Sequence, residues 1–307
     1  MIHTVTVNPA LDLTYRVPAV TFDDTVRARS VLRAAGGKGV NVSRVATRLG
    51  HTTVAMGFAG GRAGDEILDL LRDEGVRTWF AHHDAPTRTN AIVQDDAGQQ
   101  LRVSGPGPEV RSSEVDGLID TVFELRAPDF LVLSGSLLPG VPSDLYAKIA
   151  ERSAAEGVPV VVDADTELAA ALAAGVALIK PNAYELARLT QMHVHDVASA
   201  RAASHTALDM GADVVVASLG AQGAVWTSEE GAWHATAPDV PVDSALGAGD
   251  SLLAGLLVAR ADGATPEEAL RYGVACGSAT AMTPGTDLCH REDVDALTPH
   301  VTVQRLD

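Results

Sequence analysis

The segment best suited to chemistry is Gly247-Ala248-Gly249-Asp250, which directly precedes a strongly apolar helix pattern. Free N–H groups and the positive end of the dipole make the start of a helix an anion site, and glycine lets a phosphate group come close. An aspartate there would repel the anion, so a functional Asp250 would instead accept a proton from an attacking hydroxyl group. The competing interpretation is structural, with Asp250 only capping the helix.

Two common nucleotide-binding loops are excluded. The chain contains no GxxxxGK[ST] sequence, and the GxGxxG pattern fails because Leu252 stands where the third glycine is required. The first strand pattern is followed by NPALD rather than by a glycine-rich loop. The sequence therefore indicates neither a P-loop nor a dinucleotide-binding fold.

A second glycine-rich segment, AGGKGVN at 35–41, opens a helix that we expect at about 40–49. Its three glycines, with Lys38 and Asn41, would place backbone amides, a cation and a side-chain amide around a small polar ligand. A flexible turn is the alternative, but three glycines in four residues cost folding entropy. We therefore favour a binding site.

Charged residues elsewhere fit the same kind of ligand. Arg88 and Arg102 lie on strand patterns, and arginine suits a bidentate grip on phosphate, although a strand arginine is often only solvated. Lys180 and Asn182 follow a buried strand, at the edge where α/β sheets bind ligands. Glu185 could hold Mg²⁺ through water there, or could simply be a first-turn helix residue favoured by the dipole.

Buried strands alternate with helices through most of the chain. Continuous apolar runs predict strands at 130–136, 158–165, 177–182 and 213–220, with helices at 143–155 and 167–174 between them. Strands that are apolar on both faces indicate a mostly parallel sheet covered on both sides by helices. Thr265-Pro266-Glu267-Glu268 predicts the capped start of a later helix.

Two segments, 10–35 and 86–104, each read as strands with polar faces and without a helix between successive strands of the segment. They predict a small separate sheet, serving either as a lid over the site or as an edge extension. We expect one domain over 1–307, in which this lid joins a core formed by 1–9, 36–85 and 105–307.

Composition narrows the class of protein. The 307 residues are 46% hydrophobic and carry a formal net charge of −17, which argues against disorder and against a nucleic acid partner. No apolar stretch suggests a membrane partner or a signal peptide. The only cysteines, Cys276 and Cys289, are expected as buried thiols in a reducing cytoplasm.

In this order, the motifs resemble the ribokinase-like carbohydrate kinases of the phosphofructokinase-B type, in their sugar-phosphate branch. The resemblance runs almost end to end, through TVTVNPALD, GGKGVNVSRV, TRTN, SGSLLPGVP, KPNAYEL, VASLGAQGA and GAGDSLLAG. It departs at Leu138, where the family commonly has proline. The resemblance implies the ribokinase-like α/β fold and phosphoryl transfer from ATP with Mg²⁺.

The resemblance also implies a role for each matching residue. Asp250 would be the catalytic base, beside an anion hole formed by Gly247, Ala248 and Gly249. The residues that would bind the sugar phosphate are Asp12, Gly37, Lys38, Asn41, Arg88, Arg102 and Ser136. Those that would bind ATP are Lys180, Asn182, Glu185, Ser218 and Gly220. Glu185 would in addition hold the metal, through water.

The expected substrate is a ketohexose phosphate. Lys38 occurs in the fructose-1-phosphate and tagatose-phosphate members of the family, whereas the minor 6-phosphofructokinase tends to have glycine there. We favour fructose 1-phosphate, with tagatose 6-phosphate and fructose 6-phosphate as alternatives. A kinase of an unphosphorylated sugar or nucleoside would not need Arg88 and Arg102, and a non-catalytic sugar-binding protein would be expected to have lost Asp250. The family resemblance also implies a homodimer formed through the lid.

Overall fold

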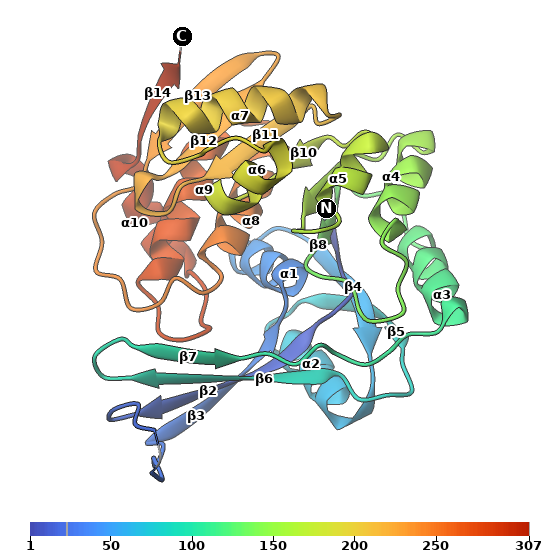
Figure 1. Ribbon diagram of the computed structural model, residues 1–307, viewed down its shortest axis with the longest axis vertical. Coiled ribbons are helices and arrows are strands. Elements are labelled where there is room, and N and C mark those ends of the chain that lie inside the picture. The colour runs from blue at the N-terminus through green and yellow to red at the C-terminus, as the bar shows by residue number, and fades with distance from the viewer. Residues whose placement is uncertain (23, 307) are drawn as a thin grey trace.

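The computed structural model describes residues 1–22 and 24–306, which form two β-sheets of unequal size (Figure 1). The larger is a ten-stranded sheet. In spatial order its strands are β14 (Thr302–Leu306), β13 (Gly231–Thr236), β12 (Ala224–Ser228), β11 (Val214–Ser218), β10 (Leu178–Ile179), β9 (Val160–Asp163), β8 (Phe130–Ser134), β1 (Ile2–Thr6), β4 (Thr53–Ala59) and β5 (Arg77–His82). Neighbours from β5 to β11 run parallel, and β12 to β14 are antiparallel.

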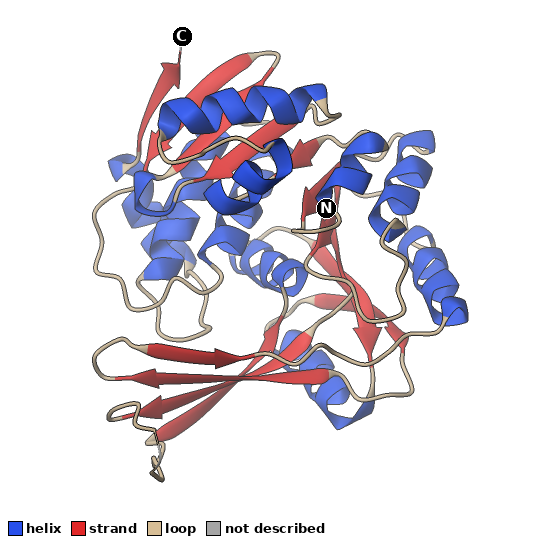
Figure 2. Ribbon diagram, viewed as in Figure 1, coloured by secondary structure: helices blue, strands red, loops and turns tan. Residues whose placement is uncertain are grey.

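Helices cover both faces of this sheet (Figure 2). One face packs on α3 (Ser112–Phe123), α4 (Leu145–Ala155), α5 (Leu168–Ala173), α6 (Ala183–Thr190) and α7 (Val197–Asp209). The other packs on α1 (Lys38–Arg48), α8 (Ala248–Ala261), α9 (Pro266–Ala281) and α10 (Arg291–Leu297). Two single 3-10 turns, η1 (Gly220–Gln222) and η2 (Thr298–His300), complete these connections.

The core follows from the alternation of side chains along each strand. In β1, Ile2 points into one hydrophobic cluster and Val5 into the other, so the sheet separates two cores. Helix α8 is buried from Asp250 to Val258, in agreement with its apolar sequence on all sides. A third, smaller cluster joins α2 (Gly61–Asp73) to the inner ends of the second sheet.

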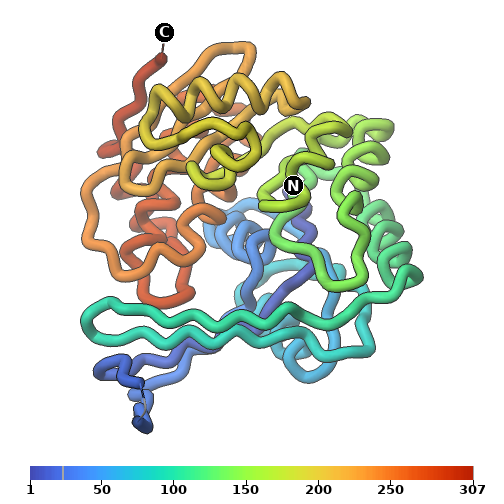
Figure 3. Tube along the Cα trace, in the orientation of Figure 1, coloured from blue at the N-terminus to red at the C-terminus, as the bar shows by residue number. Residues whose placement is uncertain are grey.

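The second sheet contains four strands in the order β3 (Ser30–Gly36), β2 (Ala10–Val17), β6 (Arg88–Asp95) and β7 (Gln100–Val103). Figure 3 shows that its two segments, far apart in the chain, lie side by side beneath the main domain. Strands β2 and β6 run parallel, with Asp12 opposite Asn90. The predicted small sheet is therefore present, and we refer to it as the lid sheet.

The predicted strands and helices of the main domain are confirmed to within a few residues. The Thr265 side chain accepts a hydrogen bond from the Glu268 amide, as the capping sequence predicted. Helix α1 starts at Lys38, two residues earlier than expected, because Gly37 forms its N-cap at φ 120°. Cys276 and Cys289 are buried free thiols. Among the described residues, no helix combines the length and apolar character needed to cross a membrane.

Candidate active site

The carboxyl ends of the parallel strands bring polar residues, predicted and unpredicted, to one edge of the main sheet. Ser134 ends β8, Asp163 ends β9 and Lys180 follows β10, while the start of α8 faces the same edge. Parallel strands place such positions together because their carboxyl ends share one side of the sheet. The lid sheet begins here as well, since Ala10 of β2 follows β1 after a short turn.

The start of α8 is open toward this edge. Gly247 is the N-cap, with the left-handed φ of 76°, and no side chain caps the helix. The first amides of α8 are therefore not satisfied by a cap of its own. A Cβ atom built on Gly249 would lie 3.3 Å from Lys180 Nζ, so a buried ammonium group adjoins these amides. Together they form a place for an anion.

Asp250 lies in the first turn of the same helix and is buried. Its Oδ2 accepts a hydrogen bond of 2.8 Å from Asn41 Nδ2, on α1. Burial, and then the nearby charge of Asp163, raise the pKa of Asp250 to about 6, against the opposing effects of Asn41 and two lysines. Since Asp250 does not cap α8, the competing structural interpretation loses its support.

A carboxylate that the sequence analysis missed connects the two lysines of the site. Asp163, fully buried, lies 3.0 Å from Lys38 Nζ and 3.4 Å from Lys180 Nζ. Although burial alone would raise the pKa of Asp163, the two ammonium groups hold it below its ordinary value. The only local signal was its position at the end of the VVVD strand, where many aspartates merely terminate a strand.

Lys38 has different neighbours from those expected. Its Nζ also lies 3.6 Å from Glu185 Oε1, so the lysine expected at the substrate's own phosphate contacts residues expected on the ATP side. Burial alone would lower the pKa of Lys38, but Asp163 and Glu185 raise it above its ordinary value. Lys38 therefore remains a cation at neutral pH, within the group that contains Lys180.

Asn182 and Glu185 hold each other at the start of α6. The Glu185 amide donates to Asn182 Oδ1 at 2.8 Å, and the Asn182 amide donates to Glu185 Oε2 at 2.9 Å. This capping box realises the structural role considered for Glu185. It uses only one carboxylate oxygen, so Oε1 stays directed toward Lys38.

The remaining predicted ATP-side residues follow the next strand. Ser218 ends β11 and forms an isolated parallel bridge to Asn182. Gly220 starts η1 with a positive φ of 59°. Ser218 therefore lies beside the start of α6, on the strand next to the one that precedes Lys180, and Gly220 follows it two residues later.

The predicted sugar-phosphate residues lie where the lid sheet meets the core. Asn90 donates to Asp12 Oδ1 at 2.7 Å. Arg88 is held by two backbone carbonyl groups, those of Gly105 at 2.8 Å and Asn8 at 3.0 Å. Asn8 Nδ2 also donates to Ser136 Oγ at 3.3 Å, so Ser136 and Arg88 share one neighbour. Burial raises the pKa of Asp12, against the opposing effects of Asn90 and Arg88.

Arg102, the remaining predicted sugar-phosphate residue, lies exposed on β7 of the lid sheet. It pairs with Ile92 across the β6–β7 register, so it projects from the same face of the lid sheet as Asn90 and Asp12. Its guanidinium group contacts only the Gln100 side chain among the described residues. Arg102 is therefore free to turn toward a ligand beneath the lid.

The site residues fit an Mg²⁺ ion carried in with phosphates. Asp163 Oδ2 lies 3.4 Å from Lys180 Nζ, whereas Glu185 Oε1 is left out of the capping box and lies 3.6 Å from Lys38 Nζ, so Glu185 is the carboxylate better placed to hold the ion through water. Mg²⁺ takes one or two carboxylates with water and substrate phosphates rather than a closed protein cage. No cluster of three or more His, Cys, Asp or Glu side chains suited to a metal occurs in 1–22 and 24–306.

Comparison with known proteins places this geometry in a family. The sequence pattern of the pfkB family of carbohydrate kinases matches residues 5–293. The chain is 34% identical to 1-phosphofructokinase of Bacillus subtilis, over 100% of both chains. It is also 34% identical to ATP-dependent 6-phosphofructokinase isozyme 2 of Escherichia coli, over 96% of this chain and 97% of that one.

The solved structures agree. Phosphofructokinase-2 of Escherichia coli, crystallised with substrates and products, superposes with a TM-score of 0.93 at 34% identity, over 97% of this chain and 98% of that one. The expected ribokinase-like fold is thereby confirmed, and with it the general class of carbohydrate kinases. Within that class, the chain belongs to the pfkB family.

Proposed function

We propose that this kinase transfers the γ-phosphoryl group of ATP to the 6-hydroxyl group of fructose 1-phosphate, giving fructose 1,6-bisphosphate. The observation that carries the proposal is the buried Asp250 carboxylate, fixed by Asn41 beside the open start of α8. This arrangement supports proton transfer and anion binding at one place, as phosphoryl transfer to an alcohol requires.

The steps follow from the positions of the side chains. Asp250 accepts the proton of the attacking hydroxyl group, which Asp12, Gly37 and Asn41 hold in place through the other hydroxyl groups of the sugar. The amides of Gly247, Ala248 and Gly249 then stabilise charge on the transferred group. Because these amides are fixed before substrate binds, they need little rearrangement at the moment of transfer.

Two lysines serve the same end of the site. Lys180, beside Gly249, and Lys38, linked to it through Asp163, supply positive charge where the phosphates of ATP would lie. Asn182, Ser218 and Gly220 would line the nucleotide on the adjoining strand ends. Mg²⁺, held by Glu185 through water, would neutralise phosphate charge when bound.

The substrate's own phosphate would lie under the lid sheet. Arg88, Arg102 and Ser136 surround the place where the lid meets the core. Burial lowers the pKa of Arg88, partly offset by Asp12, yet the guanidinium group stays charged and would gain from an anionic partner. This supports a phosphorylated substrate over a free sugar or nucleoside.

The choice among ketohexose phosphates rests on Lys38. Fructose 1-phosphate and fructose 6-phosphate can offer opposite hydroxymethyl groups to one base, and the two enzyme relatives named above are equally identical to this chain. Lys38 resembles the fructose-1-phosphate and tagatose-phosphate members of the family and counts against fructose 6-phosphate, because 6-phosphofructokinases of this type tend to have glycine there. The 1-phosphofructokinase relative then supports fructose 1-phosphate. Phosphorylation of tagatose 6-phosphate and phosphorylation of fructose 6-phosphate are the alternatives, the latter supported by the 6-phosphofructokinase relative.

We further propose that two chains pair through the outer face of the lid sheet. Val31, Leu101 and Val103 all project from this face and expose 46%, 41% and 58% of their surface. Val31 lies on the edge strand β3, and Leu101 and Val103 lie on the opposite edge strand β7, so this face exposes apolar side chains at both edges, which is typical of an interface. The proposed location is the cytoplasm, where ATP is present and free thiols such as Cys276 stay reduced.

The test is ATP consumption by the purified protein with Mg²⁺, using the three ketohexose phosphates and free fructose and ribose as acceptors. We expect kcat/KM for fructose 1-phosphate to exceed the others by about 100-fold, or roughly 2.7 kcal/mol in transition-state binding. Preference for another ketohexose phosphate would retain the mechanism and change the substrate. Turnover of free sugars alone would contradict the roles of Arg88 and Arg102.

A further inference from the structure

Residues 283–289, between α9 and α10, form a loop that contacts the proposed anion hole from behind. Leu288 lies directly against Gly247, since a Cβ atom built on Gly247 would come within 2.6 Å of Leu288 Cδ2. The Gly285 carbonyl accepts a hydrogen bond of 2.8 Å from Ser244 Oγ, in the segment that leads into α8. The 283–289 loop therefore sets the space available to the first residue of the anion hole.

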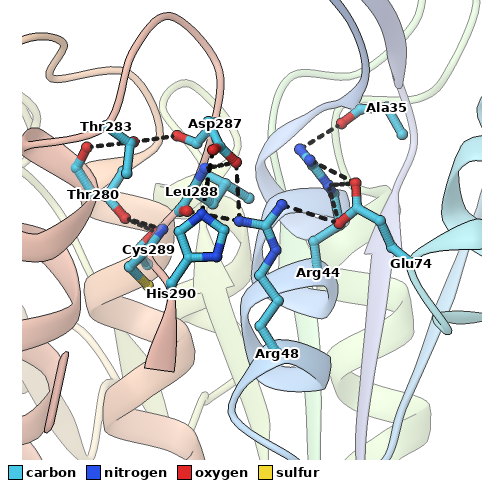
Figure 4. Close-up of polar contacts among 11 residues, drawn as sticks. Ala35, Arg44, Arg48, Glu74, Thr280, Thr283, Asp287, Leu288, Cys289 and His290 are labelled. Atoms are coloured by element: carbon cyan, nitrogen blue, oxygen red, sulfur yellow. Dashed lines mark hydrogen bonds and ion pairs between the residues drawn. The ribbon is translucent and has the colours of Figure 1, made fainter. Parts of the chain in front are cut away.

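Arg48, in the last turn of α1, attaches the loop to that helix (Figure 4). Arg48 Nη1 donates to Asp287 Oδ1 at 3.0 Å and to the Leu288 carbonyl at 2.6 Å. The Leu288 amide in turn donates to the same Asp287 oxygen at 2.8 Å. The guanidinium group thus fixes the backbone of Leu288, the residue that packs against Gly247, directly at its carbonyl and through Asp287 at its amide.

Arg48 is itself held from the other side. Its Nη2 lies 3.4 Å from Glu74 Oε2, and Glu74 makes a tight pair with the buried Arg44. Arg44 also donates to the Ala35 carbonyl, directly before the glycines that lead into α1. Figure 4 shows these groups in one line from Ala35 to Asp287.

Both ends of helix α1 consequently act on the site, the first turn directly and the last turn through the 283–289 loop. Its first turn carries Lys38 and Asn41, and its last turn carries Arg48. Arg48 is further stabilised in this position because a cation in the last turn of a helix interacts favourably with the helix dipole. Movement of the 283–289 loop away from α1 would remove Leu288 from Gly247 and leave the first turn of α8 unsupported.

We propose that Arg48 is a positioning residue for phosphoryl transfer, holding the 283–289 loop against Gly247 so that the anion hole keeps its shape. The proposal rests on the proposed function, because the anion hole is the feature being positioned. Arg48 touches neither ATP nor sugar in this account. Its loss should slow transfer and leave substrate binding nearly intact.

Arg48→Gln tests this, with Arg271→Gln as a matched control. Arg271 likewise donates to a carbonyl group, that of Val301 at 2.5 Å, and to a carboxylate, that of Glu267 at 3.0 Å, but it contacts no residue of the loop. We expect Arg48→Gln to lower kcat tenfold or more, on the order that small misplacements at a reaction centre cost. The KM values for sugar phosphate and ATP should change by no more than about twofold, and Arg271→Gln should keep kcat.

Hydrogen exchange of backbone amides provides a readout that does not depend on turnover. In Arg48→Gln, the amides of 247–251 and 283–289 should exchange faster, while those of α4 should not change. Unchanged exchange in both segments, or an equal loss of kcat in the two arginine variants, would overturn the proposal. An increase in KM without a fall in kcat would also overturn the proposal.

Arg48→Lys covers the case in which the glutamine variant does not fold. Lysine keeps the charge but lacks the planar fork that contacts Asp287 and Leu288 together, so kcat should still fall. If the wild type phosphorylates no sugar phosphate, the proposed function fails. The exchange experiment would then still show whether Arg48 holds the loop.

Discussion

Asn41 and Asp250 are joined by a hydrogen bond of 2.8 Å that links the first turn of α1 to the first turn of α8. The two residues are 209 positions apart in the chain. The hydrogen bond from Asn41 favours the ionised form of the Asp250 carboxyl group. It also occupies Oδ2 as an acceptor. The other oxygen, Oδ1, is left to receive a proton from a substrate.

Asp250→Asn should remove this proton acceptor while keeping the shape of the side chain. We expect kcat to fall by roughly 10²- to 10⁴-fold, the range for loss of a general base. Binding of the sugar phosphate, measured by calorimetry without ATP, should stay within a few-fold. Full turnover in this variant would show that another group, or none, takes the proton.

The pH dependence of kcat/KM should show an acid limb near pH 6. Burial first, and then the charge of Asp163, raise the pKa of Asp250 to about 6 from an ordinary value near 3.8. Only the ionised carboxylate can accept a proton, so kcat/KM should decrease roughly tenfold per pH unit below 6 and be level above it.

Asp163→Asn provides the check on that assignment. Removing its negative charge should lower the pKa of Asp250 and move the acid limb to lower pH, because Lys38 and Lys180 then act on Asp250 without compensation. Initial rates from pH 4.5 to 8 at subsaturating sugar phosphate would show the shift. An unmoved limb would mean that a group other than Asp250 sets it.

Arg102→Gln should weaken binding of the phosphorylated substrate alone. Losing one charge-assisted contact should raise KM for the sugar phosphate by about tenfold, with kcat little changed. The control is Arg33→Gln, since Arg33 lies on the outer face of the lid sheet and pairs with Glu66. An equal rise in KM in the two variants would show that Arg102 acts only through the overall charge of the lid sheet and not by contact with the substrate.

The proposed dimer can be tested with two neighbouring residues of β3. Val31 and Leu32 are exposed to a similar extent, 46% and 44%, but project from opposite faces of the lid sheet. Val31→Asp should yield a monomer in light scattering after size exclusion, and Leu32→Asp should not. A wild-type monomer at micromolar concentration would refute the pairing.

Much of the fold could be predicted because its signals are local. The strands β8 and β9 are apolar on both faces, and the start of α9 carries its own cap at Thr265. The start of α8 was equally visible, since its glycines adjoin Asp250 in the sequence. Each of these features is decided by neighbours along the chain.

What the sequence analysis missed depends on contacts across the fold. The ion pair of Lys38 with Asp163 spans 125 positions, and the pair of Arg48 with Asp287 spans 239. An aspartate at a strand end or an arginine in a last helical turn is common for local reasons alone. Their partners become identifiable only once the parallel sheet brings the strand ends together.

The lid sheet consists of two hairpins, β2–β3 and β6–β7, joined along one parallel seam from Ala10 opposite Arg88 to Val17 opposite Asp95. An isolated two-stranded hairpin is at best marginally stable in water. During synthesis on the ribosome, the first hairpin must therefore wait for the arrival of β6, which follows α1, β4, α2 and β5 in the chain. A strand made early thus depends for its stability on its partner in the seam, 78 positions further along the chain.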